Sequence, residues 1–228
     1  MEVAAMWSCW RVVMVLIGLI LSLTSAAQDE GKIHLKTLAS FARASLTLPK
    51  KMSFAQPGPE PNNPQGDILR LGGALTVALT KKTEASYEVA FSLVDGNLQN
   101  GFTDYRSWPP NADKTYPYSR VTRMDPIQTL KLAFGKPNPT ERLSTSRRYG
   151  VGVSKIGLAV EQGFDRSGSR QPLRSVHGKG YGWLAFVNWD SPTTSISLEV
   201  GPISRLNFGS FGKAKYSEVN LTATFPFR

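Results

Sequence analysis

The sequence predicts an all-β protein, an antiparallel up-and-down β-barrel of about eight strands with long loops at one end. Two observations predict this fold. Apolar and polar residues alternate along most of the candidate strands, as expected when successive side chains point to opposite faces. The connections between these segments are long and short in alternation, which is typical of barrels with tight turns at one end and extended loops at the other.

The clearest alternation lies in residues 67–94, where two stretches are joined by a short polar turn. One face of this hairpin is small or polar, and the other carries large apolar side chains. The apolar face consists of Leu69, Leu71, Leu75, Val77, Leu79, Tyr87, Val89, Phe91 and Leu93. A soluble β-sandwich buries such a face between its two sheets, whereas a membrane barrel turns it towards lipid. The alternation by itself allows both arrangements.

Gly, Pro, Asn and Asp residues divide the chain into strand candidates and connections, as turn chemistry requires. The expected strands are 33–48, 67–79, 86–94, 119–134, 148–160, 179–189, 193–206 and 214–227. Long loops are expected at 49–66, 95–118 and 161–178, an intermediate connection at 135–147, and shorter ones at 80–85, 190–192 and 207–213.

Two of these strand candidates have ambiguous patterns. In the first, Leu35, Leu38, Ala42 and Leu46 also fit one face of a helix, so residues 28–48 have an alternative as an N-terminal amphipathic helix on the membrane. In the fifth candidate the apolar positions change parity after Val153. A β-bulge near Ser154 and Lys155 is expected to cause that change.

The N-terminus predicts export. Arg11 precedes an uncharged apolar run at 12–23, and small residues follow at 24–27. This order is typical of a secretory signal peptide at 1–27, because the run is shorter than the roughly 20 residues of a transmembrane helix. The only cysteine, Cys9, lies in this segment. Residues 28–228 are then expected to form a single barrel domain.

With these features, the chain resembles the small eight-stranded outer-membrane β-barrels over about residues 33–228. In that class the last strand commonly closes with a terminal aromatic residue. The final residues here are Phe225, Pro226, Phe227 and Arg228, so the aromatic residue is penultimate and a proline interrupts the last strand. The resemblance implies a location in the outer membrane, with a periplasmic or extracellular location as the alternative.

The formal net charge of +10 indicates an anionic partner. For an exported protein we expect outer-membrane lipid or lipopolysaccharide, or an acidic polysaccharide, rather than nucleic acid. Four basic residues in and beside the expected loop 161–178 are the candidates for contact with an anionic surface. They are Arg166, Arg170, Arg174 and Lys179.

Five charged residues fall on the small-residue parity of the strands and are expected to face the barrel lumen. They are Arg70, Glu88, Lys131, Glu199 and Glu218. Because an unpaired buried charge is very costly, we predict that these residues form an internal ion-pair network that fills the lumen.

The sequence offers little chemistry for catalysis. His177 with Ser175 is a weak candidate pair, with Ser167 or Ser169 as other hydroxyls and Asp165 or Glu161 as the orienting acid. Neither a metal-ligand motif nor a cofactor motif is visible. The leading hypothesis is therefore a non-enzymatic outer-membrane barrel whose basic outer loops contact lipopolysaccharide or another anionic surface.

Two alternatives to this hypothesis remain open. One is a soluble secreted β-sandwich that binds carbohydrate through the loop aromatics Tyr105, Trp108, Tyr116 and Tyr118. The other is a lipid A-modifying barrel enzyme that uses His177.

Overall fold

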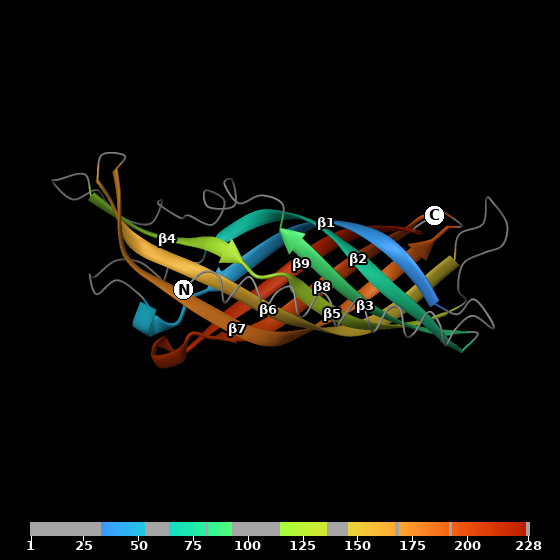
Figure 1. Cartoon of the computed structure of the whole chain (residues 1–228). Coiled ribbons are helices and arrows are strands. Elements are labelled where there is room, and N and C mark those ends of the chain that lie inside the picture. Colours follow the sequence, from blue (N-terminus) through green and yellow to red (C-terminus); the bar gives the residue numbers. More distant parts are fainter. Residues whose placement is uncertain are drawn as a thin grey trace, which may run out of the picture.

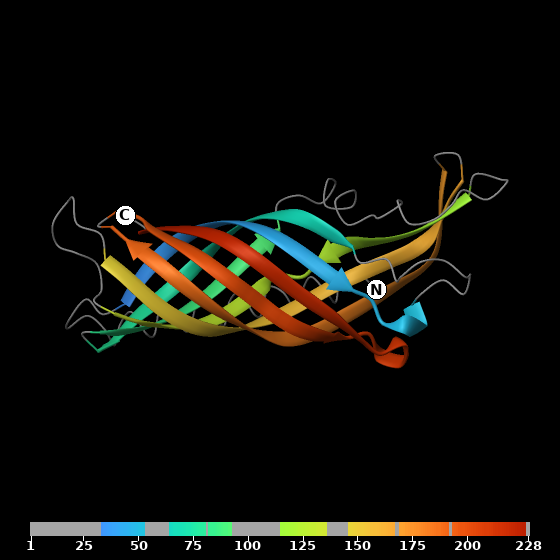
Figure 2. The ribbon, with the colours of Figure 1, turned by 180° about the vertical axis from the view of Figure 1, so that it is seen from behind.

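The strands of the computed structural model form one antiparallel sheet that closes into a barrel (Figures 1 and 2). The structure describes residues 33–52, 64–80, 82–92, 115–135, 146–166, 169–191 and 193–226. The strands are β1 (Ile33–Thr47), β2 (Gln65–Thr80), β3 (Thr83–Ser92), β4 (Thr115–Met124), β5 (Ile127–Phe134), β6 (Ser146–Arg166), β7 (Ser169–Asp190), β8 (Ser195–Asn207) and β9 (Lys213–Pro226).

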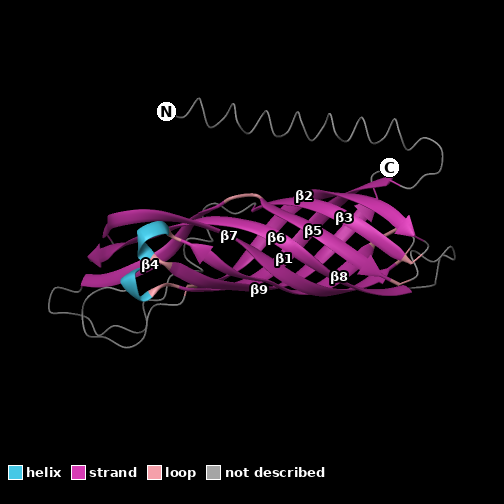
Figure 3. Ribbon diagram, turned by 90° about the horizontal axis from the view of Figure 1, so that it is seen from below, coloured by secondary structure: helices cyan, strands magenta, loops and turns pink. Residues whose placement is uncertain are grey.

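Two short 3-10 helices, η1 (Lys50–Met52) and η2 (Gly209–Phe211), lie together at one end of the barrel, which we call the η end (Figure 3). The opposite end, where β9 finishes, is the far end. None of the helices in the described residues is long and apolar enough to cross a bilayer.

The nine strands of the described residues occupy eight positions around the barrel. The order of pairing is β4-β6-β5-β3-β2-β1-β9-β8-β7, and a further pairing between β6 and β7 closes the ring. β4 and β5 both pair with the same edge of β6, β4 towards the η end and β5 towards the far end. They form one strand position that is interrupted at Asp125 and Pro126. The predicted up-and-down barrel is therefore confirmed, and β4 and β5 together correspond to the predicted strand 119–134.

The strand predicted at 33–48 is confirmed as β1, whereas its helix alternative and one predicted loop are wrong. Residues 33–47 form the strand β1, which pairs with β2 and β9, so the amphipathic-helix alternative fails where the chain is described. The predicted long loop at 161–178 is instead a continuous hairpin, in which β6 reaches Arg166 and β7 begins at Ser169. The predicted signal peptide lies outside the described residues.

The predicted bulge at Ser154 and Lys155 is also wrong. The register of β6 with β7 runs without a break past this point and shifts only between Gln162 and Gly163. Val153 and Lys155 both stay on the outer face, and Ser154 stays inside. What changes along β6 is the environment on each side of the wall and not the direction of the side chains.

Several strands show the same change at about one level of the barrel. Towards the far end, the outer face is apolar and the inner face is mostly small, polar or charged, although Leu38, Leu184 and Phe186 also point inwards. Towards the η end, the outer face becomes polar, as at Arg43 after Phe41 on β1, and the inner face becomes apolar. The inner cluster, which we call the η-end core, contains Ala42, Ala44, Leu46, Leu48, Met52, Ile68, Val121, Ile156, Leu158, Val160, Leu206, Phe208, Ala214 and Tyr216.

This inversion divides the barrel into two parts. The far part has the polarity of a membrane barrel, with an apolar outside and a polar inside. The η part has the polarity of a soluble barrel, with an apolar core and a polar outside. β6 and β7 are longer than the roughly 9–11 residues that a membrane strand needs, and they continue through both parts.

Candidate functional site

An ion pair links β2 and β9 inside the barrel. The guanidinium of Arg70 donates two hydrogen bonds to the carboxylate of Glu218, at 2.9 and 2.5 Å. The side chains of Arg70 and Glu218 are 4% and 0% exposed. The hydroxyl of Tyr216, which belongs to the η-end core, also donates to Glu218. The pair therefore lies where the polar lumen meets the η-end core.

A second group surrounds Lys131 of β5. Its ammonium lies 2.5 Å from the carboxylate of Glu199 and 2.8 Å from that of Glu88. It also lies 5.4 Å from the ring centre of Phe186, within the range of a cation–π contact. The structure thus brings together all five residues that were expected to face the lumen, as one pair and one triad rather than as a single network.

A third group, centred on Arg148, was missed by the sequence analysis. Arg148 binds Asp190 at the far end of the lumen and lies 2.9 Å from a carboxylate oxygen of Glu84, which Lys36 approaches to 3.8 Å. Arg148 lies on the same face of its strand as Gly150 and Gly152, so the alternation of the sequence would have placed it inside the barrel. Asp190 and Glu84 were assigned to turns, which hid their partnership.

Small cavities separate these groups. Two of them have volumes of about 30 Å³ each, enough to hold ordered water. Buried polar atoms that lack a hydrogen-bond partner line them, among them Arg70 Nε, Asn220 Oδ1, Asn188 Oδ1 and Ser197 Oγ. Single bound waters would satisfy these atoms.

The lumen is also closed at the η end. Gln162 Nε2 donates to the backbone carbonyl of Met52 at 2.8 Å and to Ser119 Oγ at 2.7 Å. Arg174 donates to Gln162 Oε1 and to the same Met52 carbonyl, at 2.8 and 3.1 Å, and lies 4.9 Å from the ring centre of Phe211. These bonds hold η1 and η2 over the η-end core.

The four predicted contacts with an anionic surface have different environments. Arg174 is half-buried and engaged as described above, so its guanidinium is not free on the outer surface as predicted. Lys179 is exposed on the outer face of β7. The side chains of Arg166 and Arg170 lie outside the described part of the molecule. Sequence analysis missed three further outward cations near Lys179, namely Arg205, Lys213 and Lys215.

His177 has a carboxylate partner, but not one of those expected. Its Nε2 lies 2.9 Å from Asp125 Oδ2 at the break between β4 and β5, and Gly157 leaves the space for that carboxylate. Ser175 makes no hydrogen bond to His177 in the described part of the chain. Glu161 is bound to Tyr118 and Arg120 instead.

Neither ligand chemistry nor sugar stacking gains support from the described side chains. Tyr118 is fully buried, so it does not belong to an exposed aromatic platform, and Tyr105 and Trp108 lie outside the described residues. Among the described residues, no group of three or more His, Cys, Asp or Glu side chains could hold a metal ion.

Large apolar side chains form a belt around the outside of the far part of the barrel. Leu69 of β2 and Phe91 of β3, which form a hairpin, are 43% and 50% exposed. The other members include Leu35, Phe41, Leu71, Leu79, Leu130, Phe134, Tyr149, Val151, Val153, Trp183, Trp189, Ile196, Leu198, Val200, Ile203, Val219, Leu221 and Phe225. The fold and these surfaces define an antiparallel β-barrel with an apolar exterior belt and a closed, ion-paired lumen.

No family model matches the sequence, and no curated protein matches it. The fold is similar to that of Ail of Yersinia pestis, solved with the heparin analogue sucrose octasulfate, at 11% identity over 86% of this chain and 99% of that chain (TM-score 0.42). It is also similar to Neisserial surface protein A, at 11% identity over 85% and 97% (TM-score 0.37).

A further similar fold is the N-terminal β-barrel domain of OprF from Pseudomonas aeruginosa, at 12% identity over 85% of this chain and 98% of that one (TM-score 0.31). These neighbours are small outer-membrane β-barrels. The likeness is one of architecture, as the resemblance drawn from the sequence implied.

Proposed function

We propose that the protein is a non-enzymatic barrel of the bacterial outer membrane, with no open pore, whose basic outer surface contacts lipopolysaccharide or another anionic surface. The observation that carries this proposal is the exterior apolar belt. In water, so large a contiguous exposed apolar surface would drive aggregation, whereas in a bilayer it is the expected exterior.

The dimensions and edges of the belt support insertion in a membrane. A transmembrane strand needs about 9–11 residues, which the outward apolar positions from Leu69 to Leu79 of β2 match. Aromatic side chains lie at both edges, with Tyr181 and Trp183 towards the η end and Trp189 and Phe225 towards the far end. Tyr and Trp favour such interfaces because each joins an apolar ring to a polar group.

The soluble sandwich fits these observations poorly, because a sandwich buries its apolar parity between two sheets. Here that parity faces outwards from a single closed sheet. The lipid A-modifying enzyme needs an activated nucleophile, and among the described side chains His177 is hydrogen-bonded to a carboxylate and to no hydroxyl. We therefore base the proposal on binding rather than on catalysis.

Fractionation tests the location. We expect the folded protein to sediment with the outer membrane and to remain insoluble without detergent. On gels, unheated samples should migrate differently from boiled samples, because a closed barrel resists SDS until it is heated. A protein that stays in the soluble fraction after removal of residues 1–27, with no change of mobility on heating, would contradict the proposal.

The ion pairs that cross the lumen predict that the barrel does not conduct. Lys131, Glu88 and Glu199 meet within hydrogen-bond distance inside the barrel, and the η-end core fills the space above the Arg70–Glu218 pair. In planar bilayers we expect no stable single-channel steps, under conditions in which a general porin gives them. Reproducible large conductance steps would show that the lumen opens.

A further inference from the structure

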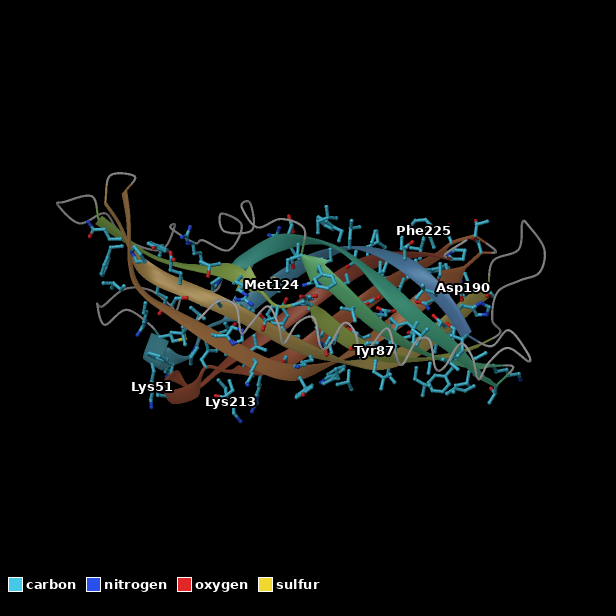
Figure 4. The ribbon with its side chains drawn as sticks, viewed as in Figure 1. Lys51, Tyr87, Met124, Asp190, Lys213 and Phe225 are labelled. Carbon is cyan, nitrogen blue, oxygen red and sulfur yellow. The ribbon has the colours of Figure 1, made fainter. Side chains whose placement is uncertain are left out.

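Four cations form a cluster on the outer wall of β7, β8 and β9, immediately on the η side of the apolar belt. Arg205 of β8 and Lys215 of β9 are direct neighbours across the two strands. One level further out, Asn207 pairs with both Lys179 of β7 and Lys213 of β9. All four cationic residues are exposed. Figure 4 shows Lys213 on the outside towards the η end and Phe225 towards the far end.

This cluster contains no opposite charge among the described residues. Arg205 and Lys215 form no ion pair there, and neither do Lys179 and Lys213. Two other outward cations do have acidic neighbours, since Arg43 lies 3.0 Å from Asp67 and Arg123 lies 3.5 Å from Asp125. Like charges directly opposite each other on neighbouring strands are destabilising. The cluster therefore lowers the stability of the isolated barrel, and a bound anion would remove that cost.

A groove of about 640 Å³ lies against this cluster. Its lining combines the two cations Arg205 and Lys215, several hydroxyl groups, and aromatic and aliphatic side chains at the edge of the belt. The lining residues are Ser45, Thr47, Tyr181, Trp183, Ile203, Ser204, Arg205, Lys215, Tyr216 and Ser217.

The polarity of the groove changes along the barrel axis. Tyr181 of β7 lies opposite Arg205 of β8. This follows from the register of the two strands, in which Lys179 lies opposite Asn207 and Gly182 lies opposite Ser204. Trp183 and Ile203 pair one level nearer the belt. Donors for an anion thus lie on the η side, and apolar surface for hydrocarbon lies directly beneath them.

We propose that this groove binds the phosphorylated headgroup of one lipid of the outer leaflet. The phosphate accepts charge-assisted hydrogen bonds from Arg205 and Lys215, and the acyl chains lie along the belt beneath Ile203. A guanidinium and an ammonium suit a phosphate group, and basic residues at the interface attract anionic lipid. This inference rests on the proposed function, because it requires that the belt is embedded in the outer membrane with the η end outside. The η end carries the longer connections between β1 and β2 and between β3 and β4, as the outer side of such barrels does.

The test compares two double variants of the full barrel, purified in detergent micelles. R205Q/K215Q removes both cations of the groove, and R43Q/K155Q removes two outward cations elsewhere on the wall, so both variants lose the same charge. Native mass spectrometry then measures the retention of bis-phosphorylated lipid A, of the same lipid after dephosphorylation, and of inorganic phosphate.

We expect wild type and R43Q/K155Q to retain bis-phosphorylated lipid A equally. R205Q/K215Q should bind it roughly thirtyfold more weakly, since each interfacial cation contributes about a fivefold step. Dephosphorylated lipid and free phosphate should bind weakly to all three proteins. Equal losses in the two double variants, or equal binding of lipid with and without phosphates, would overturn the proposal.

A parallel gel of the same preparations distinguishes failure of the lipid site from failure of the proposed membrane barrel. If all the proteins show heat-modifiable mobility and none selects the phosphorylated lipid, the groove is not a lipid site and the proposed membrane barrel still holds. If the wild type shows no heat-modifiable barrel at all, the proposed function itself fails.

Discussion

Replacing Glu218 by Leu is expected to destabilise the barrel by about 3–5 kcal/mol, the usual cost of removing one partner of a buried ion pair. The reason is that Arg70 would keep its charge at a position where both side chains are almost fully buried. Tyr216 would lose its acceptor as well. Urea unfolding in lipid vesicles, followed by tryptophan fluorescence, measures the change.

Two comparisons make this result specific to the pair. The double variant R70M/E218L removes both charges and should recover most of the lost stability, because an apolar pair of similar volume often replaces a buried ion pair at little cost. Asp67→Asn breaks the ion pair between Asp67 and Arg43 on the outer surface. The side chain of Arg43 is 63% exposed and that of Asp67 is 49% exposed. The substitution should change stability by less than about 1 kcal/mol. A double variant as unstable as E218L would contradict the ion-pair explanation.

The parity of the strands made the barrel and its lumen predictable from the sequence. A strand that separates lipid from a polar lumen has to alternate, and this constraint assigns Arg70, Lys131 and Glu218 to the inside without any knowledge of their partners. Their pairing was not predictable, since it depends on which strands are neighbours around the ring. Arg148 was missed because its partners Asp190 and Glu84 are at strand ends, where boundaries are uncertain.

The change of pattern near Ser154 was visible in the sequence but was explained wrongly. Apolar residues move from odd to even positions of a strand in two cases. Either a bulge turns the side chains to the other face, or the apolar side of the barrel wall changes from the outside to the inside. Only the register distinguishes them, and it is continuous at this point. The same change on β1, from Phe41 outside to Ala42 inside, indicates that the outer face changes from apolar to polar at one level on several strands. A comparison of all the strands at once would have suggested this reading.

The level of that change can be tested by placing a charge on each side of it along one strand. Gln65 and Leu71 both lie on the outer face of β2 and are exposed. If the belt is in lipid, Leu71→Arg should destabilise the barrel by up to about 2–4 kcal/mol, the cost of an arginine deep in the bilayer, and Gln65→Arg by only about 0–1 kcal/mol. Gln65 lies opposite Ser45 of β1, so the new arginine meets no like charge across the strands.

The same pair of variants separates a membrane barrel from a soluble one. In water both positions are exposed, so Leu71→Arg would remove apolar surface from solvent contact and would leave the stability unchanged within about 0.5 kcal/mol. Unfolding in vesicles and the yield of membrane-inserted protein measure the effect. Equal stabilities for the two variants would place the whole outer wall in water. A cost confined to Leu71 would place the boundary of the bilayer between these two residues, on the η side of the belt.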